Sequence, residues 1–359
     1  MRTIAISNQK GGCGKTTTAI NLSACLDLNG QKVLLIDMDP QGHSSIGLNV
    51  KTHELERTVY DVLCSSEAPG KALDDVTVQI TENFHIAPSS LALSVLEHDL
   101  RMKQGRETRL KEAVEGLEQL YDYIIIDCPP NLGLLTFNSL MASTEVFIPI
   151  DMGFFSLHGT GKLLEIIDTV RNKTGHLIRV KVIATMYDKR TRIAAQIVQN
   201  LLDHFENSMF LTVINSNVRL KQAASFGKSI VDYDKKSQGY KDYMALSKEV
   251  VEEEKIPGVL RAAQQKKPLS QPTRIKKQFF FYAPEASSVK IIGNFNDWVP
   301  TSDSLMERME NGTWTKTIAL APGEYQYKFV VDDVWVEDYN NPNSVVNPFG
   351  GKNSLIEIH

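Results

Sequence analysis

The feature that most constrains the fold is a glycine-rich stretch near the start of the chain. An apolar segment over residues 3–7 leads into Lys-Gly-Gly-Cys-Gly-Lys-Thr-Thr at 10–17, and a helical pattern over 17–29 follows, ending at Gly30. Glycines let backbone N–H groups curl around phosphate oxygens, and the helix N-terminus adds the positive end of its dipole. A strand, such a loop and a helix in this order predict a phosphate-binding α/β domain.

The side chains of this loop, a variant of the P-loop pattern, supply the charge that a bound phosphate needs. We expect Lys15 to neutralise phosphate charge and the Thr16 hydroxyl to bind Mg²⁺. Cys13 is expected to be a small filler residue inside the loop. The residues expected to bind the nucleotide are Lys10, Gly11, Gly12, Cys13, Gly14, Lys15, Thr16 and Thr17.

Two later strand-like segments end in aspartates. Residues 34–36 lead into Asp37 and Asp39, and residues 123–126 lead into Asp127. Ligands of open α/β sheets bind beyond the carboxyl ends of the strands. These three aspartates can therefore converge on Mg²⁺ and the attacking water of a nucleotide site.

The first 254 residues alternate apolar runs with helical patterns, which predicts a mostly parallel sheet with helices on both faces. The fold class is therefore an α/β P-loop NTPase domain. The expected strands are residues 3–7, 33–37, 84–87, 123–127, 146–150 and 180–186. The expected helices are residues 17–29, 108–119, 161–173, 193–205 and 240–253.

Charge and aromatic content divide the chain further. The net charge is −5 over residues 1–254, +7 over residues 255–277 and −6 over residues 278–359. The last segment holds 13 of the 28 aromatic residues, including all three tryptophans. We expect a P-loop NTPase domain over 1–254, a basic flexible linker over 255–277 and a small domain over 278–359. The linker is either a solvated spacer or a basic arm that touches nucleic acid or an acidic surface.

The C-terminal segment has the pattern of a small antiparallel, immunoglobulin-like β-sandwich. The expected strands are residues 277–283, 289–293, 314–320, 325–331 and 354–358. We expect four aromatic residues in its core: Trp314, Tyr325, Tyr327 and Phe329. Trp298 and Trp335 stand at turn-like places instead, where a large aromatic side chain is harder to bury.

Composition and cysteine spacing indicate the cellular compartment. The four cysteines all lie in the first 128 residues and form no CxxC pair, so reduced thiols fit better than disulfides or a zinc site. No apolar run approaches the roughly 18 residues needed to cross a bilayer. We therefore expect a cytoplasmic protein without a membrane partner.

The motifs of the first domain together resemble the ParA/Soj branch of the ParA/MinD family of deviant Walker A ATPases. The matching segments are KGGCGKTTT, LLIDMDPQG, APSSLAL, YDYIIIDCPPNLGLLTFNSL, ATMYDKRT, NVRL, SFGK and YDKKSQGYKDYMALSKEV. The resemblance implies ATP and Mg²⁺ as cofactors and a sandwich homodimer that forms on ATP binding. It also implies slow ATP hydrolysis that a ParB-like partner stimulates through a basic N-terminal peptide.

The resemblance also assigns roles to individual residues. Lys10 would reach the phosphates bound by the other subunit, and Asp39 would position the attacking water. Lys10, Lys15 and Asp39 are thus the expected catalytic residues. Thr16 and Asp127 are the expected Mg²⁺ residues, Asp127 acting indirectly, with Asp37 as a further candidate.

Non-specific DNA binding by the ATP-bound dimer is a further implication of the family. Arg190 in YDKRT and Arg219 in NVRL match positions of this kind. Their contacts with phosphates would give salt-sensitive, sequence-independent binding and an association with the nucleoid. Relatives often read Pro-Arg-Asn-Val-Arg where this chain reads Asn-Ser-Asn-Val-Arg at 215–219, so one arginine is absent. A solvated basic surface is the alternative.

Residues 278–359 resemble the glycogen-binding domain of the AMP-activated kinase β subunit and related early-set domains. The matching segments are GNFNDW at 293–298 and GEYQYKFVVD at 323–332. The resemblance implies an α-glucan platform in which flat aromatic faces stack on glucose and polar donors fix its hydroxyls. The platform residues it names are Trp298, Lys328 and Trp335, with Phe349, Gly351 and Asn353 in a later polar loop. Related modules often have threonine where Gly351 stands.

Three functions follow from these two resemblances. The first is a DNA-associated positioning ATPase whose C-terminal module binds an α-glucan such as glycogen. The second keeps that ATPase and makes the module a protein-docking domain. The third is a glucan-sensing ATP switch that does not partition DNA.

Overall fold

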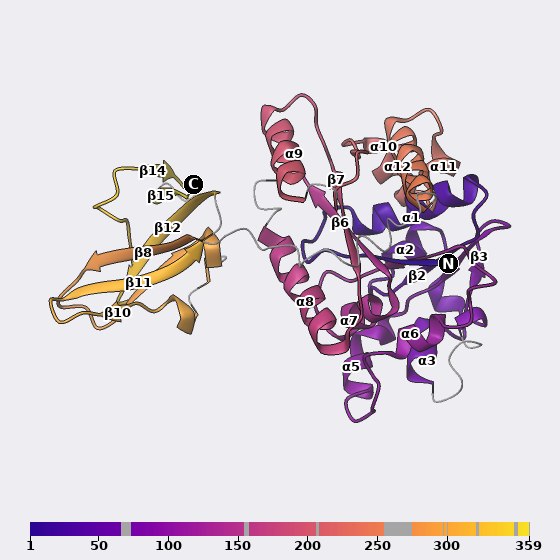
Figure 1. The fold of residues 1–359 in the computed structure, drawn as a ribbon, viewed down its shortest axis with the longest axis horizontal. Coiled ribbons are helices and arrows are strands. Elements are labelled where there is room, and N and C mark those ends of the chain that lie inside the picture. The colour runs from indigo at the N-terminus through magenta and orange to yellow at the C-terminus, as the bar shows by residue number, and fades with distance from the viewer. Residues whose placement is uncertain are drawn as a thin grey trace. The chain divides into compact units, whose positions relative to one another are not determined.

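The computed structural model describes residues 1–65, 73–153, 158–205, 208–254, 275–296, 298–299, 301–320, 323–347 and 351–358. The chain forms two compact units, Met1–Pro268 and Leu269–His359 (Figure 1). Residues 255–274 of the expected basic linker lie outside the described residues. Among the described helices, none is both long enough and apolar enough to cross a membrane.

A seven-stranded sheet forms the centre of the first unit. Its order is β3-β4-β2-β5-β1-β6-β7, and every neighbouring pair is parallel except β3 with β4. The strands are β1 (Arg2–Ile6), β2 (Val33–Asp37), β3 (Val78–Gln79), β4 (Phe84–Ala87), β5 (Tyr123–Asp127), β6 (Glu145–Asp151) and β7 (Arg179–Thr185). The central strands β1, β2 and β5 are buried along their whole length, which explains their apolar sequences.

Helices cover both faces of this sheet, as expected. Helices α1, α10, α11 and α12 pack together on one side, and α3, α5, α6 and α7 gather on the other (Figure 1). The helices are α1 (Lys15–Leu28), α2 (His43–Gly47), α3 (Val59–Cys64), α5 (Leu96–Asp99), α6 (Arg109–Val114), α7 (Leu134–Ala142), α8 (His158–Thr174), α9 (Arg192–Phe205), α10 (Val218–Ser225), α11 (Ile230–Tyr233) and α12 (Gln238–Glu254).

All five expected helices exist, with boundaries that differ from the expected ones by up to five residues. Two of these differences have a clear local cause. The first helix begins at Lys15 rather than Thr17, because Gly14 adopts a left-handed conformation and directly caps it. The helix expected over 108–119 ends at Val114, since Glu115 has an extended backbone and Gly116 has a φ of 96°. Gly30, with a φ of 80°, follows the end of α1 as expected.

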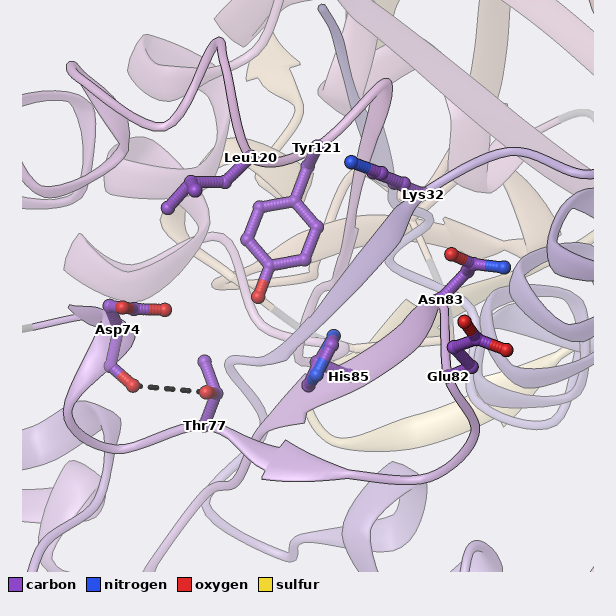
Figure 2. Close-up of a pocket in the computed structure, with 8 residues that line it drawn as sticks. All are labelled: Lys32, Asp74, Thr77, Glu82, Asn83, His85, Leu120 and Tyr121. Atoms are coloured by element: carbon purple, nitrogen blue, oxygen red, sulfur yellow. Dashed lines mark hydrogen bonds between the residues drawn. The ribbon is translucent and has the colours of Figure 1, made fainter.

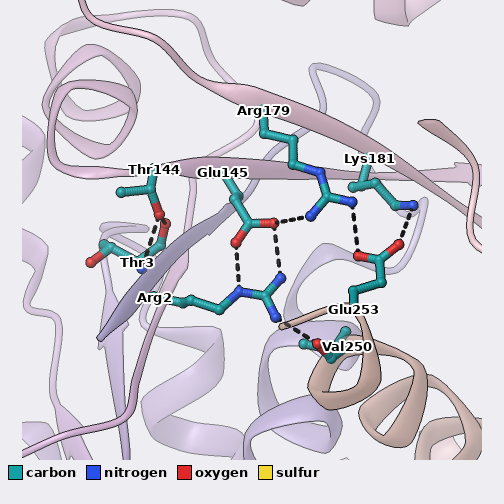
Figure 3. A network of polar contacts seen from close by, with 8 residues as sticks. All are labelled: Arg2, Thr3, Thr144, Glu145, Arg179, Lys181, Val250 and Glu253. Carbon is teal, nitrogen blue, oxygen red and sulfur yellow. Dashed lines mark hydrogen bonds and ion pairs between the residues drawn. The ribbon is translucent and has the colours of Figure 1, made fainter. Parts of the chain in front are cut away.

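A buried ionic network fastens α12 to the amino-terminal ends of β6 and β7 (Figure 3). Arg2 donates to the two carboxylate oxygens of Glu145 at 2.6 and 2.9 Å. Arg179 contacts Glu145 at 3.4 Å and Glu253 at 3.0 Å. Lys181 binds the other oxygen of Glu253 at 2.6 Å. These ion pairs hold α12 against the sheet.

The second unit consists of two antiparallel sheets, which agrees with the expected β-sandwich. One has the order β10-β11-β8; in the other, β12 pairs with β13, β15 and β9, and β15 pairs with β14. Trp314, Tyr325, Tyr327 and Phe329 lie in its core, as expected. The strands are β8 (Ile275–Tyr282), β9 (Val289–Gly293), β10 (Glu307–Arg308), β11 (Thr313–Leu320), β12 (Gly323–Val331), β13 (Val334–Val336), β14 (Ser344–Val346) and β15 (Lys352–Ile358).

Candidate functional sites

The glycine-rich loop lies between β1 and α1, at the carboxyl edge of the parallel strands. Gly12 and Gly14 have φ angles of 74° and 96°, in the left-handed region that favours glycine. The Thr185 hydroxyl at the end of β7 donates to the carbonyl of Cys13 at 2.8 Å. Cys13 is fully buried, which fits a filler residue, and burial raises the pKa of its thiol. The loop is therefore held from the sheet side.

Two lysines lie along this loop. Lys15 is buried at the start of α1, and its ammonium group donates to the carbonyl of Lys10 at 3.0 Å. The Lys10 ammonium lies 2.9 Å from each carboxylate oxygen of Asp151, at the end of β6. Lys10 thus reaches across the carboxyl edge of the sheet to a partner in its own subunit.

Asp37 and Asp127 are brought together at the ends of neighbouring strands, as expected. They are register partners in the pairing of β2 with β5. The Ser44 hydroxyl donates to Asp127 at 2.7 Å, and the Ser45 hydroxyl donates to Asp37 at 2.7 Å. Asp39 follows two residues later, and its carboxylate accepts a bond of 2.9 Å from the backbone N–H of Gln41.

Burial raises the pKa values of two of these carboxylates. Desolvation, together with the nearby charge of Asp37, raises the pKa of Asp127 to about 7. Desolvation likewise raises the pKa of Asp37 to about 6, although hydrogen bonds from Ser45 oppose the rise. Within the described structure, Asp127 Oδ1 is buried without a hydrogen-bond partner. A hydrated Mg²⁺ beside Thr16 fits this arrangement, because it would satisfy that oxygen and stabilise both anions.

The two arginines expected to bind DNA flank a contact between two loops. The Tyr187 backbone N–H donates to the Ile214 carbonyl at 3.0 Å, which places the loop after β7 beside the segment leading into α10. Arg190 is exposed and pairs with Asp188 at 2.6 Å. Arg219 pairs with Asp234 at 3.5 Å. Each arginine thus already has an acidic neighbour, which sequence reasoning did not anticipate.

In the second unit, Trp298 and Trp335 lie beside each other, with ring centroids 6.4 Å apart and ring planes at 38°. Trp298 has a φ of 60°, and its backbone N–H donates to the carbonyl of Gly293 at 3.0 Å. Trp335 is 48% exposed. The prediction that Trp335 stands at a turn is wrong, because Trp335 belongs to β13 and pairs with Val330.

The later polar loop is organised around Asn353. This side chain is only 7% exposed; it accepts from the Asn347 amide at 3.1 Å and donates to Gln326 at 3.1 Å. Sequence reasoning did not single out Asn347 or Gln326, because only their place in the fold connects them to Asn353. Phe349 lies outside the described residues, and Gly351 donates its N–H to Asn347.

A cavity of about 260 Å³ opens at the opposite, amino-terminal end of the sheet (Figure 2). His85 on β4 meets the Tyr121 ring edge-on, with centroids 5.7 Å apart. Burial and the nearby charge of Asp74 raise the pKa of Tyr121 to about 12. The lining residues are Lys32, Asp74, Thr77, Glu82, Asn83, His85, Leu120 and Tyr121.

Known families match both units. The family profile described as "AAA domain" matches residues 1–180. The profile described as "Glycogen recognition site of AMP-activated protein kinase" matches residues 277–359.

Individual proteins match the first unit. The chain is 42% identical over 248 residues to the sporulation initiation inhibitor protein Soj of Bacillus subtilis (strain 168), covering 69% of this chain and 97% of Soj. It is 40% identical over 251 residues to the chromosome partitioning protein ParA of Myxococcus xanthus (strain DK1622), covering 70% and 88%. The crystal structure of cobyrinic acid a,c-diamide synthase from Mycobacterium smegmatis with bound ADP and magnesium has a TM-score of 0.62 at 30% identity, covering 71% of this chain and 96% of that one.

Proposed function

The chain belongs to the ParA and Soj family of P-loop ATPases, and from this premise we propose that it is a DNA-associated partitioning ATPase whose cargo is an α-glucan. The observation that supports the first half is the convergence of the glycine-rich loop, Asp37, Asp39 and Asp127 at one edge of the sheet. The observation that supports the second half is the tryptophan pair of the C-terminal module. ATP is the substrate, and Mg²⁺ supplies charge neutralisation on its phosphates.

Each residue of the proposed ATPase site has its own role. The loop N–H groups and Lys15 hold the phosphates, and the Thr16 hydroxyl and Asp127 hold the hydrated cation. Asp39 orients the attacking water, which displaces ADP from the γ-phosphorus. In the homodimer formed with ATP, Lys10 leaves Asp151 and meets the phosphates of the other subunit. A ParB-like partner with a basic N-terminal segment accelerates this slow step.

Arg190 and Arg219 attach the ATP-bound dimer to DNA phosphates. Because each arginine is paired with an aspartate, DNA must compete with that aspartate for the guanidinium group. The binding is therefore weak and falls steeply as salt rises. Such binding suits an ATPase that attaches to the nucleoid and detaches again in each cycle.

The C-terminal module holds the glucan by stacking and hydrogen bonding. The tilted pair of Trp298 and Trp335 matches the curved apolar face that consecutive α-linked glucose units present. Lys328 lies on β12 next to this pair, since its neighbour on the same face, Val330, is the register partner of Trp335. The lysine can then donate to sugar hydroxyls along the edge of the platform.

Affinity electrophoresis of the full chain through gels with and without glycogen tests the cargo assignment. We expect glycogen to retard the wild-type chain but not Trp298→Ala/Trp335→Ala. Val334→Ala is the control, because Val334 is an exposed residue beside Trp335. The third tryptophan, Trp314, is unsuitable for this purpose because it lies in the core. Equal mobility of the wild-type chain in gels with and without glycogen would overturn the glucan assignment.

A protein-docking role for the module is the second candidate, and one observation favours it. Phe280 and Tyr282 are 49% and 64% exposed on β8, in the sheet that does not contain Lys328. Exposed aromatic side chains of this kind are common where proteins bind each other. Retention of a protein partner that Phe280→Ser/Tyr282→Ser loses, without any retardation by glycogen, would support this candidate.

A further inference from the structure

The polar loop of the C-terminal module contains a position without a side chain. A Cβ atom on Gly351 would lie 3.3 Å from Asn347 Nδ2 and 3.8 Å from Lys328 Nζ. The amide of Asn347 and the ammonium group of Lys328 therefore both border the space in which a side chain at position 351 would begin.

Asn347 is fixed in this place by several hydrogen bonds. Its backbone N–H donates to the Gly351 carbonyl at 2.8 Å, and its side-chain oxygen accepts from the Gly351 N–H at 3.1 Å. Its amide nitrogen donates to Asn353 Oδ1 at 3.1 Å. A side chain held from both ends loses little conformational freedom when a ligand binds.

The burial of the neighbouring amides separates their roles. Asn353 is 7% exposed, and both ends of its amide are bonded within the module, to Asn347 and to Gln326. Asn347 is only partly buried. Gln326 is partly buried as well. Asn353 therefore orients both neighbouring amides, and of these two Asn347 is the one that borders the missing side chain at position 351.

We propose that Asn347 is a glucan-contacting residue that takes the place of the side chain missing at position 351, and that Asn353 and Gln326 are its positioning residues. The proposal rests on glucan binding by the module. Its ligand is the hydroxyl edge of an α-linked glucose chain, which offers donors and acceptors that an amide can match together with the lysine.

Glycogen affinity electrophoresis and titration of the full chain with maltoheptaose test this assignment. Asn347→Ala should weaken binding about fivefold, the effect of removing one hydrogen bond from an uncharged partner. Asn343→Ala, an exposed asparagine just before β14, is the matched control and should bind as the wild type does. Urea unfolding of each variant checks that the module remains folded.

A second-site rescue separates ligand contact from a purely structural role. Gly351→Thr alone should not improve binding, because the new side chain meets the Asn347 amide. Combined with Asn347→Ala, the threonine has room and should restore most of the lost affinity. Wild-type affinity of Asn347→Ala, or no recovery in the double variant, would overturn the proposal while the tryptophan variants still lose binding. If the wild-type chain binds neither glycogen nor maltoheptaose, the glucan function itself is wrong.

Discussion

At the scale of single residues, Lys10 stands between two anionic partners. In the structure its ammonium group lies 2.9 Å from both oxygens of Asp151, in a pair that is only partly exposed. In the proposed dimer the same group meets the phosphates of the other subunit. The ion pair with Asp151 therefore competes with dimer formation.

Asp151→Asn should consequently lower the ATP concentration at which the dimer forms. Because a partly exposed ion pair contributes up to about 1 kcal/mol, the midpoint should fall by up to about fivefold. Analytical ultracentrifugation across an ATP titration measures it, with Asp188→Asn as a control that removes an aspartate from an exposed pair. A midpoint that rises instead would mean that Asp151 supports the dimer.

The buried aspartates predict how stability changes with pH in the nucleotide-free protein. Their pKa values in the folded state, about 7 for Asp127 and about 6 for Asp37, lie above the unfolded value of about 3.9. The folded state therefore binds more protons than the unfolded state in this range. The stabilisation is complete below the unfolded pKa and is lost as the pH rises through about 6 to 7.

We expect the free energy of unfolding to fall from pH 5 to pH 8 in the wild type and to fall less in Asp127→Asn. Urea unfolding at several pH values measures this difference. Asp188→Asn is the control, because Arg190 lowers the pKa of Asp188 to about 2 and its titration lies outside this range. A parallel pH dependence of the wild type and Asp127→Asn would contradict the assigned ionisation.

At the scale of secondary-structure elements, the ionic network around Glu145 predicts a large loss of stability. Glu145 is fully buried between Arg2 and Arg179. Glu145→Gln keeps the shape but leaves two guanidinium groups without their shared anion, which should cost about 3 to 5 kcal/mol. Urea unfolding checks this value. Glu54→Gln, which breaks the exposed pair with Lys51, should change stability by less than about 1 kcal/mol.

The elements that could be predicted from the sequence have a clear hydrophobic period or a long apolar run. Strands β1, β2 and β5 are buried on both faces, so every residue in them is selected for burial. Helix α7 was not predicted, because its sequence LLTFNSLMA is buried around most of its surface and has no polar face. Short elements such as α11 and β13 span less than the window in which a period can be recognised.

Only the parts of the candidate site that follow from the order of strands and loops along the chain could be predicted. Asp37 and Asp127 follow apolar runs, and parallel strands place their carboxyl ends at one edge of the sheet. The partners that tune these aspartates could not be predicted in the same way. Ser44 and Ser45 reach them from a five-residue helix, and Asp151 reaches Lys10 from a strand more than a hundred residues away. Only the folded chain brings these groups together.

At the scale of the whole molecule, the chain joins two compact units that each have their own hydrophobic core. The proposed ATP, DNA and glucan sites belong to one unit or the other. In the proposed function, one chain connects a glucan to DNA while its ATPase unit is in the DNA-binding state. An assay with glucan alone or with DNA alone would not show whether one protein connects the two.

A bridging experiment tests the connection directly. Glycogen is sedimented by ultracentrifugation with the full chain and linear DNA, and the DNA in the pellet is measured with Mg-ATP or Mg-ADP. We expect DNA in the pellet with Mg-ATP only, and less of it as salt rises from about 50 to about 200 mM, because DNA binding by phosphate contacts weakens steeply with salt. Arg190→Ala/Arg219→Ala should leave the protein in the pellet without DNA.

The complementary variants identify which link fails if the DNA stays in solution. Trp298→Ala/Trp335→Ala should leave both protein and DNA in the supernatant, since the chain then has no hold on the glucan. Asp39→Ala should keep DNA in the pellet longer after ATP is supplied, because hydrolysis no longer ends the DNA-binding state. DNA that sediments equally with Mg-ADP would separate DNA binding from the ATP cycle and leave glucan attachment as an independent property of the C-terminal module.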